Sequence, residues 1–467
     1  MRSILITSIT VFALCYAVFA VTIRVPGDYP NIQAGIDAST DGDTVLVAEG
    51  YYRESVDFLE KSITLISENG AEFTTIDADS NSCTVKICSE GTVEANLAGF
   101  TITNSYTSTG SSSLSGIICN TNVLIQNNII RNIGWNFSGP GGGIHAFGGF
   151  PVIENNLITG NQCVYCGGGI YIENCDTAIV RYNTISDNYV FSGYGMADGG
   201  GICIYKSNVL VERNLVVNNW ADPNYCRGGG MSIRDSSSVY IYNNTFSNNQ
   251  GDGICFDGGF EPDRLFFINN ILVNTGGYGL ISPWQFIDLN TDYNDIFSSS
   301  SGNYYNIEPG EYDISADPLF INAGSGDYHL TENSPCIDTG DPTSPLDPDS
   351  TIADMGAFYY HHTVGIVDEP ALNAPGEFAL YPSYPNPFNA STTISFELRD
   401  AGFVSLDIFD VTGRAVGAKN LSPFNNQYLP AGSHQIVFHA EGLTSGVYFV
   451  RLETGESSQT KKILLLK

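Results

Sequence analysis

A repeating asparagine dominates the middle of this chain of 467 residues. Each copy ends a short run of branched or aromatic residues, as in segment 153–156, and it recurs in steps of 28, 27, 31, 30, 26 and 24 residues. The repeat positions are Asn128, Asn156, Asn183, Asn214, Asn244, Asn270 and Asn294. Self-similarity with a period of about 20 to 50 residues is typical of a solenoid. Strand-like units without helical periodicity indicate a β-solenoid.

Apolar residues keep a fixed place relative to this asparagine. They stand five residues before it, three before it and two after it, as Val123, Ile125 and Ile130 do around Asn128. The residues between them are mostly polar, which is the alternation expected of a strand with one buried face. We therefore expect three inward stacks of side chains. The asparagine itself is expected at a turn, in the left-handed region, with its amide stacked on those of neighbouring coils.

Glycine runs mark a second point of each repeat, at 141–143, 167–169, 199–201 and 228–230. They are expected at turns that need positive φ or a close approach of two backbones. Together with the asparagine columns, they resemble the repeats of right-handed parallel β-helices in the pectate-lyase-like superfamily, over roughly residues 22–360. Segment 31–38 is expected to form a short amphipathic helix. As in other secreted β-helices, it would cover the open end of the stack.

The C-terminal part has a different pattern, with short alternating strands and turns rich in glycine and asparagine between residues 376 and 467. The phrases 384–389, 408–414 and 446–448 resemble the type A C-terminal sorting domain of the bacterial type IX secretion system. This resemblance implies passage through the periplasm and removal of the tail, with release or surface attachment. The alternative is a permanent Ig-like accessory domain. The expected fold class is all-β: a right-handed parallel β-helix with an N-terminal capping helix, then a small Ig-like β-sandwich.

Charge and the N-terminus indicate an exported protein. The chain has 19 basic and 50 acidic residues, a net charge of −31, which opposes binding to nucleic acid. Residues 1–20 are expected to be a signal peptide, residues 21–362 the β-helix and residues 363–375 a linker. No transmembrane segment is expected in the mature protein, which is expected to be a monomer.

Ten of the eleven cysteines follow the signal peptide, as suits an oxidising compartment. Cys203 and Cys255 are expected in one outward column but two coils apart, about 10 Å, which is too far for a disulfide. Cys163 and Cys166 form a CxxC pair, for which a local disulfide or plain thiols are expected rather than redox catalysis. The connectivity is otherwise left open.

A group of acidic residues near the end of the predicted β-helix allows two interpretations. Five aspartates crowd a proline-rich loop: Asp338, Asp341, Asp347, Asp349 and Asp354. Their hard oxygens suit Ca²⁺, the one cofactor that the sequence suggests, although their spacing is not that of an EF-hand and a solvated acidic loop is the alternative.

A charged row precedes the repeat asparagines: Gln126, Glu154, Arg181, Glu212 and Tyr242. It is interpreted as a structural row that keeps the strands in register.

The strand after each glycine run carries the candidate site. Its outward positions form two rows: His145, Tyr171, Cys203, Ser232 and Cys255, then Phe147, Glu173, Tyr205, Arg234 and Asp257. Aromatic faces suit sugar rings, and arginine with carboxylates suits acidic polysaccharide. The expected ligand-binding residues are His145, Phe147, Tyr171, Tyr205, Trp220 and Arg227. The candidate catalytic residues are Arg234, Asp257 and Glu173.

The expected function is binding of an extracellular polysaccharide by a secreted or cell-surface β-helix. One alternative is a polysaccharide lyase acting on a uronate-containing substrate by Ca²⁺-assisted β-elimination, and another is a structural envelope protein or adhesin without glycan binding. The aspartate pair and Gly-His-Gly phrase of polygalacturonases are absent from the sequence, and no lyase signature matches residue by residue. Binding therefore ranks above catalysis.

Overall fold

The computed structural model describes the greater part of the chain. It covers residues 20–79, 83–89, 91, 93–104, 115–134, 141–191, 197–222, 226–235, 237–258, 264–283, 288–362, 378–381, 383, 386, 388, 391–398, 402–410, 414, 427–429, 432–440, 443–444, 446–454 and 457–465. The expected signal peptide (apart from Ala20) and the expected linker lie outside these residues. Within the described part, no helix is long and apolar enough to cross a lipid bilayer.

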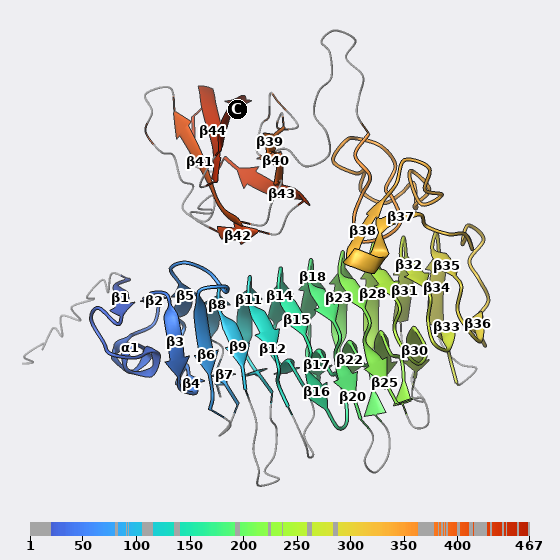
Figure 1. Ribbon diagram of the computed structural model, residues 1–467, viewed down its shortest axis with the longest axis horizontal. Helices are drawn as coiled ribbons and strands as arrows, with labels where there is room; N and C mark the ends of the chain where they lie inside the picture. Colours follow the sequence, from blue (N-terminus) through green and yellow to red (C-terminus); the bar gives the residue numbers. More distant parts are fainter. Residues whose placement is uncertain are drawn as a thin grey trace, which may run out of the picture.

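Three long parallel sheets wind around one axis (Figure 1). Sheet A contains β1 (Thr22–Val25), β2 (Thr44–Val47), β5 (Thr64–Ser67), β8 (Glu94–Ala98), β11 (Asn122–Gln126), β14 (Pro151–Glu154), β18 (Ala178–Arg181), β23 (Asn208–Glu212), β28 (Ser238–Tyr242), β31 (Arg264–Ile268) and β34 (Asp288–Asp292). Sheet B contains β3 (Gly50–Arg53), β6 (Thr74–Asp77), β9 (Thr101–Thr103), β12 (Ile129–Arg131), β15 (Leu157–Thr159), β19 (Thr184–Ser186), β24 (Leu215–Val217), β29 (Thr245–Ser247), β32 (Ile271–Val273) and β35 (Asp295–Phe297). Sheet C contains β4 (Val56–Asp57), β7 (Val85–Ile87), β10 (Ile117–Cys119), β13 (Ile144–Phe147), β17 (Ile170–Glu173), β22 (Ile202–Tyr205), β27 (Met231–Arg234), β30 (Ile254–Asp257), β33 (Tyr278–Ile281) and β36 (Gly302–Tyr305).

The inward columns are confirmed by the strand register. Val180 pairs with Val211, one coil further on, and Ile158 pairs with Ile185. These side chains are fully buried and belong to a single apolar core that runs along the solenoid. Because successive side chains of a strand point to opposite faces, each coil contributes alternate residues to this core. The right-handed parallel β-helix expected from the repeat is the observed fold.

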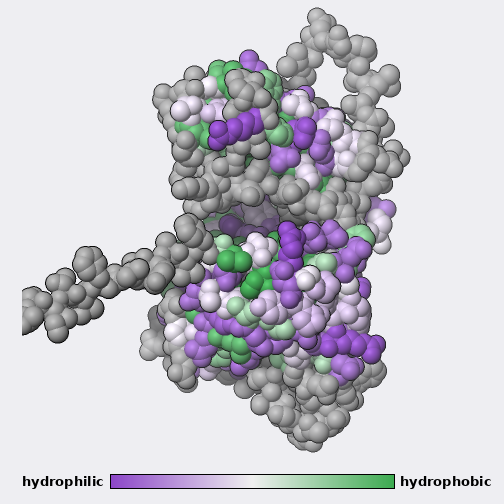
Figure 2. Space-filling model, turned by 90° about the vertical axis from the view of Figure 1, so that its left-hand side faces the viewer, coloured by the Kyte–Doolittle hydropathy of each residue, from purple (hydrophilic) through white to green (hydrophobic). Residues whose placement is uncertain are grey.

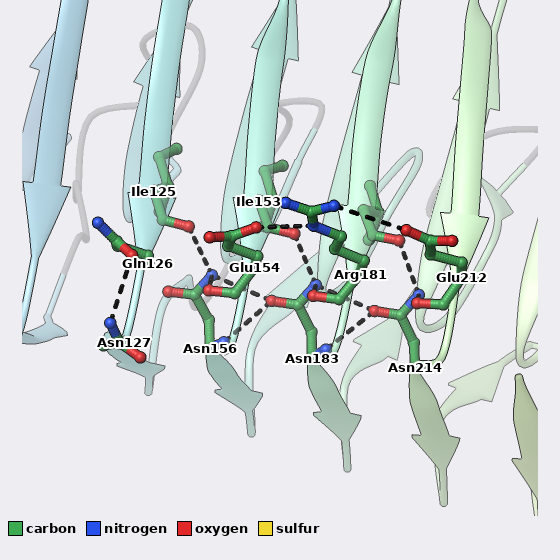
Figure 3. A network of polar contacts seen from close by, with 11 residues as sticks. Ile125, Gln126, Asn127, Ile153, Glu154, Asn156, Arg181, Asn183, Glu212 and Asn214 are labelled. Carbon is green, nitrogen blue, oxygen red and sulfur yellow. Dashed lines mark hydrogen bonds and ion pairs between the residues drawn. The ribbon is translucent and has the colours of Figure 1, made fainter. Parts of the chain in front are cut away.

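The repeat asparagines form a buried ladder at the corner between sheets A and B (Figure 3). The Asn183 amide donates to the carbonyl oxygens of Ile153 at 2.8 Å and Arg181 at 2.9 Å, and to the Asn214 side-chain oxygen at 3.0 Å. The stacked amides are therefore confirmed. The expected backbone conformation is wrong: the residue before each ladder asparagine takes the positive φ, as Tyr182 and Arg213 do. That conformation turns the chain so that the next side chain points inward.

A second asparagine ladder, absent from the sequence interpretation, lies at the other end of the sheet B strands. Its members are Asn161, Asn188, Asn219 and Asn249, all fully buried. Asn188 donates to the Ile158 carbonyl at 2.9 Å and to the Asn219 side-chain oxygen at 2.9 Å. Each stands five residues after an asparagine of the first ladder, and this spacing was the available signal.

The glycine runs follow this corner and satisfy both expected reasons. The first glycine of each run has positive φ, for example +66° at Gly167. The next has no room for a side chain, because a Cβ on Gly168 would lie 2.4 Å from the Gly200 carbonyl oxygen. The backbones of neighbouring coils therefore touch at this point, which brings the chain onto sheet C.

The N-terminal end and one side of the solenoid are covered. Helix α1 (Ile32–Ala38) caps the N-terminal end as expected, and Figure 2 looks onto this end, where hydrophilic residues surround scattered hydrophobic ones. Near the other end, β37 (Phe320–Asn322), the 3₁₀ helix η1 (Ala323–Ser325) and β38 (Asp327–Leu330) begin a closing segment. This segment, residues 314–360, packs Tyr328 against Leu215 and Leu330 against Ile271, so it covers the outer face of sheet B.

The C-terminal part folds into two antiparallel sheets around its own core, consistent with the expected small sandwich. One sheet contains β39 (Ala379–Leu380), β40 (Ser391–Leu398) and β43 (Gly432–His439). The other contains β42 (Gln427–Leu429), β41 (Gly402–Asp410), β44 (Gly446–Thr454) and β45 (Ser458–Leu465).

Candidate functional site on the outer face of sheet C

Three coils carry an excursion between sheets B and C. Its outgoing strands are β16 (Gln162–Cys163), β20 (Tyr189–Val190) and β25 (Trp220–Ala221), and its returning strands are β21 (Ala197–Asp198) and β26 (Cys226–Arg227). The insertions that lengthen two of the repeat steps belong to this excursion. It brings Asp198 and Cys166, which form a parallel bridge, against the outer face of sheet C.

Both outward rows have the expected register. Tyr171 pairs with Cys203 and Glu173 with Tyr205, while Arg234 pairs with Asp257. The first row is nevertheless covered: its members His145, Tyr171, Cys203, Ser232 and Cys255 are 0–6% exposed. His145 and Tyr171 are therefore buried, whereas the sequence predicted that they would be open to a ligand. The second row, Phe147 to Asp257, is half-buried and borders solvent.

His145, Glu173 and Tyr171 form one hydrogen-bonded group across two coils. The Tyr171 hydroxyl donates to Glu173 Oε2 at 2.6 Å, and His145 Nε2 lies 3.3 Å from Glu173 Oε1. The hydrogen bond from His145, together with that from Tyr171, lowers the pKa of Glu173 although burial opposes this. Burial raises the pKa of Tyr171, and its bond to Glu173 adds to the rise. Glu173 is therefore a fixed carboxylate, and Tyr171 a fixed neutral donor.

Arg234 is held by a partner that the sequence analysis did not assign to it. Its Nη1 lies 2.8 Å from Asp198 Oδ2, and the Asp198 side chain is 3% exposed. Burial is the largest influence and would lower the pKa of Arg234, but Asp198, the two thiols of Cys166 and Cys203, and Asp257 together outweigh it, so the pKa is raised. Arg234 is therefore a permanent cation, suited to binding an oxygen ligand rather than to removing a proton.

Two of the remaining expected binding residues, Trp220 and Arg227, lie on strands of the excursion. Trp220 stacks on Tyr189 with ring centres 4.2 Å apart and planes 8° apart, so each ring covers one face of the other. The Lys206 ammonium lies 4.8 Å from the centre of the Tyr205 ring. Arg227 is on β26, opposite Asp198 of β21, and its side chain lies outside the described part of the chain.

A pocket of about 410 Å³ opens at the N-terminal end of the same sheet face. It is lined by Asp57, Leu59, Glu60, Lys86, Cys88, Ser89 and Asn120. Lys86 pairs with Asp57 at 2.9 Å, and the register continues from Lys86 through Ile118 to His145. The pocket was missed because its strands lack the asparagine and glycine phrases. Extending the outward rows two coils toward the N-terminus would have reached it.

The acidic loop does not fit a calcium site. Asp354 accepts the backbone N–H groups of Asp338 and Tyr360, and Asp347 accepts that of Asp354. Arg213 also reaches Asp347, at 3.4 Å. These carboxylates serve the backbone of the closing segment. Among the described residues, no group of three or more His, Cys, Asp or Glu side chains is arranged to hold a metal ion.

Comparisons with known proteins agree with this architecture. The family of right-handed β-helix regions matches residues 63–226 and 166–292, and the family of secretion-system C-terminal sorting domains matches residues 383–466. A cell surface glycoprotein of Methanothermus fervidus is 28% identical over 273 residues, which cover 53% of this chain and 42% of that protein. The chain thus spans less than half the length of this relative. No solved structure matches it. The protein is a secreted or cell-surface right-handed parallel β-helix with a C-terminal sorting domain for type IX secretion.

Proposed function

We propose that the protein binds an extracellular polysaccharide along the second outward row of sheet C. The observation that carries this proposal is the row itself, in which Phe147, Glu173, Tyr205, Arg234 and Asp257 stand side by side on consecutive coils. Parallel strands repeat every ~4.8 Å, so about one sugar residue matches one coil of the row. Its two aromatic and three charged side chains offer apolar contact and hydrogen bonds together.

Arg234 is preorganised for such a ligand. Its guanidinium is tied to Asp198, and Glu173 is tied to His145 and Tyr171, so little side-chain freedom is left to lose on binding. A guanidinium has five N–H donors and a carboxylate about four acceptor sites, so both kinds of group can bind several partners at once. Sugar hydroxyls, which both donate and accept, fit this mixture.

The charge balance favours a neutral polysaccharide over an acidic one. The Arg234 charge is already compensated by Asp198, and Asp257 and Glu173 stand in the same row. The whole chain carries a net charge of −31, so a polyanion would approach against repulsion. This revises the uronate preference that arginine suggested from the sequence, because its partner was not visible there.

The same residues argue for binding rather than elimination. A lyase needs a base whose pKa lies near the ambient pH. The pKa of Arg234 is raised, and so is that of Tyr171. Neither group is therefore suited to take a proton from a sugar carbon at neutral pH.

The test is retention of the purified protein on immobilised neutral β-glucan and xylan, with polygalacturonate as the acidic comparison. Wild-type protein should be retained by a neutral polymer and not by polygalacturonate. Tyr205→Leu and Asp257→Asn should each weaken retention about 5- to 30-fold, the loss expected for roughly 1–2 kcal/mol of contact energy. The control variant Tyr240→Leu, on the outer face of sheet A, should be retained like the wild-type protein.

Arg234 needs a paired variant, because removing it alone would leave Asp198 as an uncompensated buried charge. Asp198→Asn combined with Arg234→Gln removes both charges and should also weaken retention. Absence of retention on every polymer, or variants that bind like wild type, would contradict the proposal and favour a structural role. Formation of unsaturated, ultraviolet-absorbing uronate products would instead favour the lyase alternative.

A further inference from the structure

Two cysteine side chains meet at the first outward row of sheet C. Cys166 lies between β16 and β17, and Cys203 lies on β22, opposite Tyr171. The side chains of Cys166, Tyr171 and Cys203 form one packed cluster, with Tyr205 at its edge. Cys166 is 9% exposed and Cys203 is fully buried. Both are free thiols in the structure.

Neighbouring cysteines are placed differently. Cys163, the other member of the CxxC pair, donates its thiol to the Cys166 carbonyl oxygen at 3.2 Å and packs with Val190 and Ala221 in a separate cluster. Cys255 pairs with Ser232, which itself pairs with Cys203, so a whole coil separates the two cysteines. Among these four described cysteines, Cys166 and Cys203 are therefore the pair placed to react.

The surroundings make the two thiols unequal. The hydrogen bond with Cys203 lowers the pKa of Cys166 despite burial, and Arg234 acts in the same direction. Burial raises the pKa of Cys203. Cys166 is also the more exposed of the two, so an oxidant would reach it first and Cys203 would resolve the mixed disulfide. An exported protein also meets an oxidising compartment.

We propose that Cys166 and Cys203 are joined by a disulfide bond formed during export. The Cys166 thiolate attacks the disulfide of an exported thiol oxidase, and one oxidant sulfur leaves as a thiolate. Cys203 then loses its proton, attacks the Cys166 sulfur and releases the second oxidant sulfur. The two cysteines lose two electrons and two protons, and the oxidant becomes a dithiol.

This bond would link one coil to the next. The 36 residues between the two cysteines include β17, β18, β19, β20 and β21, one full turn of the solenoid with its excursion. A cross-link over such a length restricts the unfolded chain strongly. It would also hold the excursion strand carrying Asp198 against Arg234, and it requires no bound glycan.

The test is peptide mapping of the full chain after folding in a glutathione redox buffer. The protein is unfolded in denaturant, alkylated with iodoacetamide and digested without reduction. Mass spectrometry should find the Cys166 and Cys203 peptides linked, and both cysteines alkylated only after prior reduction. Alkylation of both cysteines without reduction, or a link from Cys166 to Cys163, would overturn the proposal.

Two matched variants sharpen the assignment. Cys163→Ser should leave the Cys166–Cys203 link unchanged, because Cys163 belongs to a separate cluster. Cys203→Ala should leave Cys166 open to alkylation in denaturant without prior reduction. If Cys166 stays protected in that variant, its partner is another cysteine and the proposed pairing is wrong. The mapping of the parent protein decides the question even if a variant folds poorly.

Discussion

Asparagine residues make repeated hydrogen bonds at the two corners flanking sheet B. From Asn128 to Asn270, each side chain of the first ladder donates to two backbone carbonyls and to the next amide, and accepts from the previous coil (Figure 3). Asn294, the last member, donates to Asp313 in place of a next amide. Buried polar groups are tolerated where all their bonds are made. Asparagine suits this role because one planar amide carries two donors and an acceptor. A shorter or charged side chain would break the chain of bonds.

Replacing Asn183 with alanine should lower the free energy of unfolding by about 3 kcal/mol, since the variant leaves buried donors of Asn156 and buried carbonyls without partners. Chemical denaturation followed by circular dichroism measures this. The control is Asn208→Ala, an exposed asparagine with one bond to the Asp176 carbonyl, expected to change stability by less than about 0.5 kcal/mol. An equal loss of unfolding free energy in the two variants would show that a ladder asparagine stabilises the fold no more than an exposed one.

At the scale of elements, α1 is held at both ends by the coil that follows it. Glu54 accepts the backbone N–H groups of Ile32 and Gln33, each at 2.9 Å. Lys61 donates to the carbonyl oxygens of Ile36, Asp37 and Ser39 at 2.6–3.0 Å. A helix of seven residues is too short to be stable alone, and these charges match its dipole. The cap therefore depends on the first coils being formed.

The change Lys61→Met should loosen this cap by about 1–2 kcal/mol, because three carbonyls lose a charged donor. Faster limited proteolysis within residues 21–45 would report the effect. The matched control is Lys86→Met, since the Lys86 ammonium is an exposed partner of Asp57. Cleavage at the same rate in both variants would argue against the clamp.

The closing segment carries a pH-dependent group. Burial raises the pKa of Asp354 from its usual 3.8 to about 7, and burial also raises that of Asp347. Between pH 3.8 and about pH 7, Asp354 keeps a proton in the folded state that it has released in the unfolded state. The free energy of unfolding therefore falls as the pH rises through this range. For one such group, the free energy of unfolding changes by at most about 1.4 kcal/mol per pH unit.

We therefore expect residues 338–360 to open more readily at pH 8 than at pH 5. Hydrogen exchange followed by mass spectrometry, corrected for the intrinsic pH dependence of exchange, measures the opening. Strands β14 and β18, around Val180, provide an internal control because neither contains an aspartate. Stronger protection of the closing segment at pH 8 would reverse the sign and contradict the assignment of Asp354.

At the scale of the whole molecule, the three outer sheet faces have separate uses. The outer face of sheet B is covered by the closing segment, and sheet A carries the charged row, in which Arg181 contacts Glu154 at 2.7 Å and Glu212 at 3.7 Å. Sheet C carries the half-buried row and the pocket. The C-terminal part is nearly neutral, with 7 basic and 8 acidic residues in 376–467, so the acidity belongs to the solenoid.

Removal of the tail during secretion is the prediction at this scale. In a host with type IX secretion, the full chain should reach the cell surface or medium and end well before Lys467, while a chain truncated at residue 375 should accumulate in the periplasm. Mass spectrometry of the intact exported protein gives its C-terminus. Exported protein still ending at Lys467 would show that the sorting domain is a permanent part of the molecule.

The sequence by itself determined the solenoid, its inward columns and both outward rows. A repeat of nearly constant length forces equivalent residues of successive coils into register, and alternation along a strand decides which residues face the core. The cap over segment 31–38 and the C-terminal sandwich followed from local patterns as well. Of the candidate site, the alignment of Phe147, Glu173, Tyr205, Arg234 and Asp257 was predictable in this way.

Only the tertiary structure decided what covers those rows. His145 and Tyr171 point outward as the alternation requires, yet they are buried, because burial depends on the segments packed over the sheet and not on the strand's own pattern. The pairing of Arg234 with Asp198 joins residues of neighbouring coils at the end of an excursion whose path no periodicity describes. The same holds for Cys166 and Cys203. The sequence repeat predicts the features that all coils share, whereas the candidate site depends on residues that differ from one coil to the next.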